Sequence, residues 1–263
     1  MSDILVNQQR QDAEIESEQK SVPMISEICS PDCLKQQYEM AELKDGYTKA
    51  IVYLSKTFRL RRVRGDGNCF YRALLFSYLD DLLMKRSSPD TKDAASSELE
   101  RITDIVKGSM DDLVKVGYNE FAIETFYDMF IELLEQLPSM NREALLEEFQ
   151  EGGSGDHYTW YMRVMAAGYM KSHPDDFYPF IVGQGIYNDI ESYCSAEVEP
   201  MGKECEQAQI IALTTYLQLG VKIVYVDGHL TEGEPITHQF PEGVENFVTL
   251  LYRPGHYDLL YLK

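Results

Sequence analysis

The spacing of apolar residues changes once along the chain, close to Gly220. Upstream of this point they recur at helical spacing in several long segments, which are residues 93–117, 119–137, 142–150, 156–172 and 204–220. Downstream of it, residues 221–226, 245–252 and 256–263 are rich in β-branched and aromatic side chains and are bounded by turn-forming residues. Helices that are followed by a few strands are typical of an α+β domain. We therefore predict a helix-rich α+β fold with a small sheet near the C-terminus.

Residues 1–32 differ in composition from the rest of the chain. They are rich in Gln, Glu, Asp and Ser and contain few large apolar side chains. Such a segment buries too little surface to offset the entropy lost on ordering. Pro31 and Asp32 then mark the start of a helix. We predict a mobile acidic arm over residues 1–32 and one folded domain over residues 33–263.

The charge of the chain limits the classes of partner. Lys and Arg number 24 against 44 for Asp and Glu, which gives a formal net charge of -20. Such a surface repels the phosphate backbone of a nucleic acid. We therefore expect no nucleic-acid binding and favour a basic protein surface as the partner. No segment of the sequence approaches the about 20 consecutive apolar residues that span a membrane, so we expect no membrane association.

The cysteines indicate a reducing compartment. There are five, an odd number, and they are scattered along the chain, unlike the paired cysteines of a secreted disulfide framework. We expect free thiols and a cytoplasmic location, with the nucleus as a second compartment. Cys29 and Cys33 lie close in sequence, but no second pair of Cys or His at metal-site spacing follows them. We expect no metal and no cofactor.

Cys69 stands directly after the turn-forming residues Arg64–Asn68 and opens an apolar pattern of helical spacing. The positive end of a helix dipole favours the thiolate, which is the nucleophilic form of cysteine. Gly65 and Gly67 allow positive φ, so this loop could aim two backbone amides at one point beside the sulfur, as in an oxyanion hole. A cysteine after a turn is also often a small buried hydrophobe. On its own, Cys69 leaves both readings open.

A catalytic thiol needs a base, and the chain has five histidines. His256 and Asp258 fall on one face of a predicted strand, where the carboxylate can hold the imidazole in its useful tautomer. His229 follows Asp227 at the same spacing, but this pair lies in a turn, where alternation fails. The other histidines lack a carboxylate that could orient the ring. A His-x-Asp pair is common on solvated strands, so the prediction of a triad rests on Cys69, His256 and Asp258 together.

Two segments far apart in sequence carry a family resemblance. "GDGNCFYRA" and "YRPGHYDLLY" together resemble the otubains, which belong to the ovarian-tumour class of deubiquitinating cysteine proteases. Three further segments match in the same order, and these are Val198–Glu204, Ile210–Leu213 and Phe240–Gly243. The resemblance extends over most of residues 33–263. It implies a papain-like cysteine protease fold of the ovarian-tumour type, with a small and mainly antiparallel sheet.

The resemblance also implies roles for particular residues. Cys69 matches the nucleophile, His256 the general base and acid, and Asp258 the residue that orients His256. The catalytic loop is implied to form the oxyanion hole, with Asp66 shaping it, and its residues are Asp66, Gly67, Asn68 and Cys69. Gly65 stands where some relatives have a proline, which is expected to loosen this loop.

The implied reaction is hydrolysis of the isopeptide bond between one ubiquitin and a lysine of the next, with preference for the linkage that directs proteins to the proteasome. The implied ubiquitin contacts are Glu197, Met201, His238 and Phe240. In the family the N-terminal arm binds the second ubiquitin, and some members bind and inhibit ubiquitin-conjugating enzymes without catalysis. We expect a monomer.

Two alternatives to this reading remain. The chain could act mainly as a non-catalytic regulator that binds ubiquitin or a conjugating enzyme, or as a papain-like hydrolase or acyl transferase for another acyl group. A complete Cys, His and Asp set favours an enzyme, because a binding protein has no need of all three.

Overall fold

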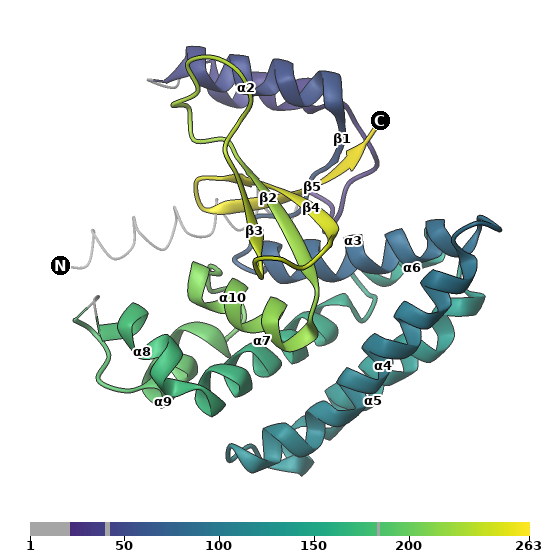
Figure 1. Ribbon diagram of the computed structural model, residues 1–263, viewed down its shortest axis with the longest axis vertical. Helices are drawn as coiled ribbons and strands as arrows, with labels where there is room; N and C mark the ends of the chain where they lie inside the picture. The colour runs from purple at the N-terminus through teal and green to yellow at the C-terminus, as the bar shows by residue number, and fades with distance from the viewer. Residues whose placement is uncertain (1–21, 40–42, 183–184) are drawn as a thin grey trace, which may run out of the picture.

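The computed structural model describes residues 22–39, 43–182 and 185–263 (Figure 1). Most of the chain upstream of residue 218 is helical, as the apolar spacing predicts. In chain order, the helical elements are η1 (Pro31–Tyr38), α2 (Lys44–Thr57), α3 (Cys69–Arg86), α4 (Lys92–Lys115), α5 (Glu120–Gln136), η2 (Leu137–Ser139), α6 (Arg142–Glu148), α7 (Gly155–Ser172), α8 (Pro174–Val182), α9 (Ile190–Tyr193), η3 (Cys194–Val198) and α10 (Gln207–Leu217). Among these described helices, none combines the length and apolar character that a membrane crossing requires.

A five-stranded sheet completes the fold, with the strand order β1-β5-β4-β2-β3. Its strands are β1 (Phe58–Arg61), β2 (Gly220–Tyr225), β3 (Thr237–Phe240), β4 (Asn246–Arg253) and β5 (His256–Leu262). The pair β2 and β4 is parallel, and the other neighbouring strands are antiparallel. The expected α+β fold with a small, mainly antiparallel sheet is therefore confirmed. Strands β1 and β3 were not predicted, because four residues are too few to show an alternating pattern.

Helix α3 lies at the centre of the molecule, between the sheet and α7 (Figure 1). Its side chains are buried on nearly every side, from Cys69 and Phe70 at its start to Leu83 near its end. The predicted helix is confirmed. The sequence predicted one buried face, whereas the structure buries nearly all of the helix surface. A helix that is surrounded in this way is held by packing along its whole length. The start of α3, which carries Cys69, is therefore fixed in space.

The N-terminal boundary of the domain differs from the prediction. Ile25 is 1% exposed and pairs with Val63 in an isolated β-bridge, and Cys29 pairs with Leu60 in the same way. Residues 22–30 thus lie along β1 and the chain that follows it, and the folded domain begins upstream of residue 33. The apolar residues of this stretch were missed because the composition was taken over residues 1–32 as a whole, which are mostly polar. Residues 1–21 of the expected arm lie outside the described residues.

Candidate active site

The loop before Cys69 owes its shape to one glycine and a close neighbour. Gly67 has φ +77, and a Cβ at this position would lie 2.2 Å from the carbonyl oxygen of Gly202. Only glycine fits both the backbone conformation and the space. Helix α3 starts two residues later, and Cys69 is 5% exposed in its first turn. The sequence Gly-Asn-Cys therefore presents the sulfur at the point where helix and loop meet.

The hairpin of β4 and β5 brings the other members of the predicted triad to this point. Arg253 and His256 are directly paired across the two strands, and Leu251 pairs with Asp258. The turn between the strands contains Pro254 and Gly255, whose φ of 72 suits glycine. Because side chains alternate along a strand, His256 and Asp258 point to the same face, as the sequence predicts.

The triad is assembled in this structure. Nε2 of His256 lies 2.9 Å from Oδ1 of Asp258, and the ring is also hydrogen bonded to Cys69. Nδ1 is on the opposite side of the ring, close to Gly65. Burial disfavours the imidazolium, but the hydrogen bonds with Asp258 and Cys69 outweigh it and raise the pKa of His256 to about 9. A raised histidine pKa favours the imidazolium, and an imidazolium that stabilises a thiolate is the pairing in which a cysteine acts as a nucleophile.

Asp258 is fully buried and has partners on both oxygens. Oδ1 accepts from the backbone N–H of Val63 at 2.9 Å as well as facing His256. Oδ2 accepts from Nε and Nη2 of Arg253, at 3.0 and 2.7 Å. Burial raises the pKa of Asp258, but the hydrogen bond to His256 and the charge of Arg253 outweigh it and hold that pKa below its usual range. Asp258 therefore stays a carboxylate.

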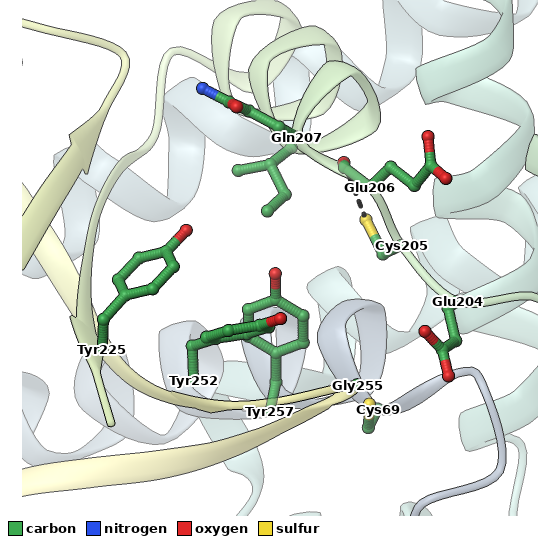
Figure 2. Close-up of a pocket in the computed structure, with 10 residues that line it drawn as sticks. Cys69, Glu204, Cys205, Glu206, Gln207, Tyr225, Tyr252, Gly255 and Tyr257 are labelled. Atoms are coloured by element: carbon green, nitrogen blue, oxygen red, sulfur yellow. Dashed lines mark hydrogen bonds between the residues drawn. The ribbon is translucent and has the colours of Figure 1, made fainter. Parts of the chain in front are cut away.

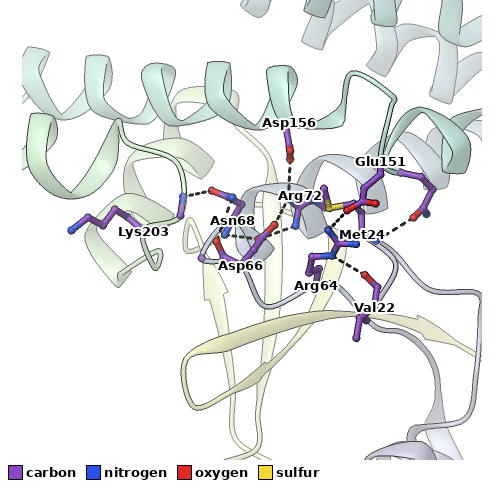
Figure 3. A network of polar contacts seen from close by, with 12 residues as sticks. Val22, Met24, Arg64, Asp66, Asn68, Arg72, Glu151, Asp156 and Lys203 are labelled. Carbon is purple, nitrogen blue, oxygen red and sulfur yellow. Dashed lines mark hydrogen bonds and ion pairs between the residues drawn. The ribbon is translucent and has the colours of Figure 1, made fainter. Parts of the chain in front are cut away.

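Asp66 lies in the catalytic loop and ties it to α3 (Figure 3). Its carboxylate accepts from the N–H of Asn68 at 3.0 Å and from two nitrogens of Arg72, at 3.0 and 2.7 Å. Arg72 also donates to Asp156 at 2.9 Å. The N–H of Asn68 is thus engaged by Asp66, which leaves the amides of Gly67 and Cys69 as donors for an oxyanion. The oxyanion-hole assignment stays a prediction.

Arg163 is a second anchor of the same loop, and no sequence pattern predicted this role. Its guanidinium is fully buried and donates to Gly67 O at 2.8 Å and to Asn68 Oδ1 at 2.8 Å. It also donates to Lys203 O at 2.6 Å and Val198 O at 3.0 Å. The residues that follow Gly65 are therefore anchored on two sides, and the looser loop expected from Gly65 stays a prediction.

A cavity of about 280 Å³ opens beside the nucleophile (Figure 2). Aromatic side chains from the sheet form one wall, and the segment that leads into α10 brings carboxylates to the other. The lining residues are Cys69, Glu204, Cys205, Glu206, Gln207, Ile210, Tyr225, Tyr252, Gly255 and Tyr257. Cys69 is part of the cavity wall, so a group bound in the cavity lies next to the nucleophile.

The residues predicted to contact ubiquitin differ in exposure. Met201 is 36% exposed, and His238 is exposed on β3, where its ring contacts Tyr225. Glu197 is half-buried and forms an ion pair with Lys203 at 3.2 Å. Phe240 is 9% exposed and packs in the core, which leaves little of it for a partner to contact. The contacts of the other three stay predictions.

The remaining sequence candidates do not form a second site. The carboxylate of Asp227 accepts from the backbone N–H of His229 at 3.1 Å, so it shapes a turn. Cys29 and Cys33 lie with their sulfurs 3.5 Å apart, and all five cysteines are free. Within the described ranges, no group of three or more His, Cys, Asp or Glu side chains is arranged to hold a metal ion.

A thiol at a helix start, an imidazole bonded to it, and a buried carboxylate behind the imidazole together define a cysteine peptidase. The comparisons with known proteins identify which one. The model of the family described as Peptidase C65 Otubain matches residues 17–262. This chain therefore belongs to the otubain family of cysteine peptidases, and the resemblance seen in the sequence is confirmed.

Known otubains are similar to the chain over most of its length. Ubiquitin thioesterase OTUB1 of Homo sapiens is 38% identical over 91% of this chain and 83% of its own. Ubiquitin thioesterase OTUB2 of Homo sapiens is 35% identical over 82% of this chain and 86% of its own. The solved complex of ceOTUB1 with ubiquitin aldehyde and UBC13~Ub aligns with a TM-score of 0.84 at 28% identity, over 97% of this chain and 99% of that one.

Proposed function

We propose that this protein is a deubiquitinating enzyme that hydrolyses isopeptide bonds in polyubiquitin. The observation that carries this proposal is the assembled set of Cys69, His256 and Asp258 in a chain of the otubain family. The relatives are named ubiquitin thioesterases, and the solved neighbours hold ubiquitin aldehyde. The cavity beside Cys69 supports it, because the nucleophile lies in its wall and the carboxylates of Glu204 and Glu206 suit a basic tail.

The chemistry follows from the geometry of the triad. The thiolate of Cys69, paired with the imidazolium of His256, attacks the carbonyl carbon of the ubiquitin tail, and the negative charge on the oxygen is stabilised by backbone amides of the loop. His256 gives its proton to the departing lysine amine as the C–N bond breaks, and a thioester to Cys69 remains. His256, now neutral, takes a proton from the water that attacks the thioester, and as the C–S bond breaks Cys69 leaves as the thiolate beside the imidazolium. Asp258 holds the ring in place through both steps.

We also propose a preference for the ubiquitin linkage that directs proteins to the proteasome, on the strength of family membership. The direct experiment is incubation of the protein with ubiquitin dimers of each linkage, beside a Cys69→Ala variant. We expect one linkage to be cut well ahead of the others and the variant to be inactive. Equal cutting of all linkages would remove the preference, and cutting by Cys69→Ala would remove Cys69 as the nucleophile.

A second proposed activity is binding of ubiquitin-loaded conjugating enzymes. It is favoured by the alignment with solved complexes of OTUB1 with UBC13~Ub and UBCH5B~Ub, at TM-scores of 0.84 and 0.82. Phe121 at the start of α5 is 87% exposed, the highest value among the described large apolar side chains. We expect Cys69→Ala to keep inhibiting ubiquitin transfer. Phe121→Asp and removal of residues 1–21 locate the contact, because inhibition weakens in a variant that has lost part of it.

These tests separate the enzyme from the mainly non-catalytic regulator. Inhibition of transfer by a protein that cuts no ubiquitin dimer would favour the regulator. The cytoplasm is the location that we propose for either activity, because an enzyme that depends on a thiol and has five free cysteines suits a reducing compartment.

A further inference from the structure

The two oxygens of the Asp258 carboxylate have separate tasks. Oδ1 faces the catalytic side, with His256 Nε2 and the N–H of Val63 each at 2.9 Å. Oδ2 faces away from the histidine and receives the planar fork of Arg253, with Nε at 3.0 Å and Nη2 at 2.7 Å. A carboxylate held by one oxygen can still rotate about its Cβ–Cγ bond. The fork on the second oxygen lies where it opposes that rotation.

We infer that Arg253 is a positioning residue for the hydrolysis, because it fixes the plane of the Asp258 carboxylate so that Oδ1 stays aimed at His256. This inference rests on the proposed function of the triad. Arg253 is 9% exposed and is not among the residues that line the cavity. It therefore acts through Asp258 and not on the substrate. Lysine could supply the charge but not the fork.

Arg253 is itself held by the N-terminal part of the domain. Its remaining terminal nitrogen, Nη1, donates to Gln37 Oε1 at 2.9 Å and to Tyr38 OH at 3.3 Å. Both residues belong to η1, and the ring of Tyr38 is stacked on Tyr47 of α2 with 3.9 Å between centroids. The polar chain thus runs from η1 through Arg253 and Asp258 to His256. We extend the inference to Gln37, which restrains Arg253 from outside the triad.

The charged groups around His256 come from several elements. Asp258 and Arg253 lie on the sheet, Cys69 lies at the start of α3, and the carboxylate of Glu204 lies beside Gly255 in the hairpin turn. Of these, Asp258 is the one bonded to Nε2. Rotation of its carboxylate therefore changes the orientation of the His256 ring. It does not change the cavity wall, because Asp258 is not among the residues that line the cavity.

The experiment compares Arg253→Gln, Arg253→Lys and Gln37→Ala with wild type in the full chain. Cleavage of a ubiquitin dimer gives kcat and KM, and the rate of Cys69 alkylation by iodoacetamide reports the triad without ubiquitin. We expect Arg253→Gln to lower kcat by about 10- to 100-fold, a range taken from the loss of the hydrogen-bond partners that orient histidine ligands in metal sites. KM should stay unchanged, and alkylation should slow. Arg253→Lys should recover part of the loss.

Gln36→Ala is the matched control, because Gln36 is an exposed glutamine of η1 that does not contact Arg253. We expect Gln37→Ala to reduce kcat less than Arg253→Gln does and more than Gln36→Ala does. A melting curve for each variant shows whether it folds. If Arg253→Gln does not fold, Gln37→Ala tests the inference instead, because Gln37 is exposed. Unchanged kcat and alkylation in Arg253→Gln, or a loss confined to KM, overturns the inference. Wild type that cuts no dimer overturns the proposed function instead, and alkylation then still decides the role of Arg253.

Discussion

Replacing Asp258 by Asn tests how the active site keeps His256 protonated. The substitution keeps the shape of the side chain but removes the charge that Arg253, His256 and the N–H of Val63 share. The ring of His256 then loses the negatively charged acceptor that contributes most to its raised pKa, while the burial that lowers this pKa remains. We expect the pKa to fall from about 9 toward its ordinary value of 6.5.

The structure sets the size of the effect. With a pKa of about 9, the wild-type ring is almost wholly imidazolium at pH 7.5, whereas a ring with a pKa near 6.5 is protonated in roughly one molecule in ten. The lower pKa alone thus reduces the fraction of molecules that hold the imidazolium at this pH by roughly 10-fold. Loss of the fixed ring orientation adds to this, and in serine triads the same change costs about 10⁴-fold. We expect kcat for dimer cleavage to fall by about 10²- to 10⁴-fold.

The assay is the pH profile of dimer cleavage for wild type and Asp258→Asn, with melting curves to show that the variant is folded. We expect the alkaline limit of activity near pH 9 in wild type and a shift of that limit to lower pH in the variant. Asp227→Asn is the control, since this exposed aspartate also precedes a histidine by two residues but serves a turn. Equal profiles for wild type and Asp258→Asn would refute the reasoning, as would a loss of activity in Asp227→Asn.

Other predictions concern the loop and the stability of the site. Gly67→Ala should abolish most activity, because a Cβ 2.2 Å from Gly202 O must separate the two loops. The measurement is kcat of the folded variant. Gly108→Ala is the control, since nothing lies within 4 Å of a Cβ at that position. Arg163→Met should lower the free energy of unfolding by about 1 to 3 kcal/mol, measured by urea unfolding, because buried acceptors lose their donor. The raised pKa of His256 stabilises the fold in full below pH 6.5 and loses this contribution as the pH rises through about 9. The urea midpoint should therefore fall over that range in wild type and fall less in His256→Asn.

The sequence predicted the parts of the site that depend on local pattern. Cys69 before a helical run and His256 with Asp258 on one strand face are visible as spacing, and the structure brings them together. Arg253 was missed although a signal existed. In "RPGHYD" a two-residue turn places Arg253 opposite His256, so the arginine belongs to the same face as the triad. A hairpin reading of that segment finds it.

Other features could not be read from the sequence because they depend on distant contacts. Arg163 sits within the apolar run of α7, and nothing in that helix shows that carbonyls of residues 67, 198 and 203 converge on its guanidinium. The burial of Ile25 gave no signal either, since the few apolar residues around it follow neither a helical nor a strand period. Its burial depends on the pairing with Val63. Both cases are tertiary contacts that override local composition.

The burial of α3 has a consequence for how the protein moves. Segments packed on all sides open only when the whole domain unfolds, whereas surface turns open with much less free energy. The backbone of Cys69 starts the first kind of segment, and His256 follows a turn of the second kind, at Pro254 and Gly255. Amide hydrogen exchange should therefore be slow along α3 and faster at the tip of the hairpin. Within this active site the nucleophile therefore lies on the segment that opens least. We expect local opening that interrupts catalysis to begin at the hairpin that carries His256.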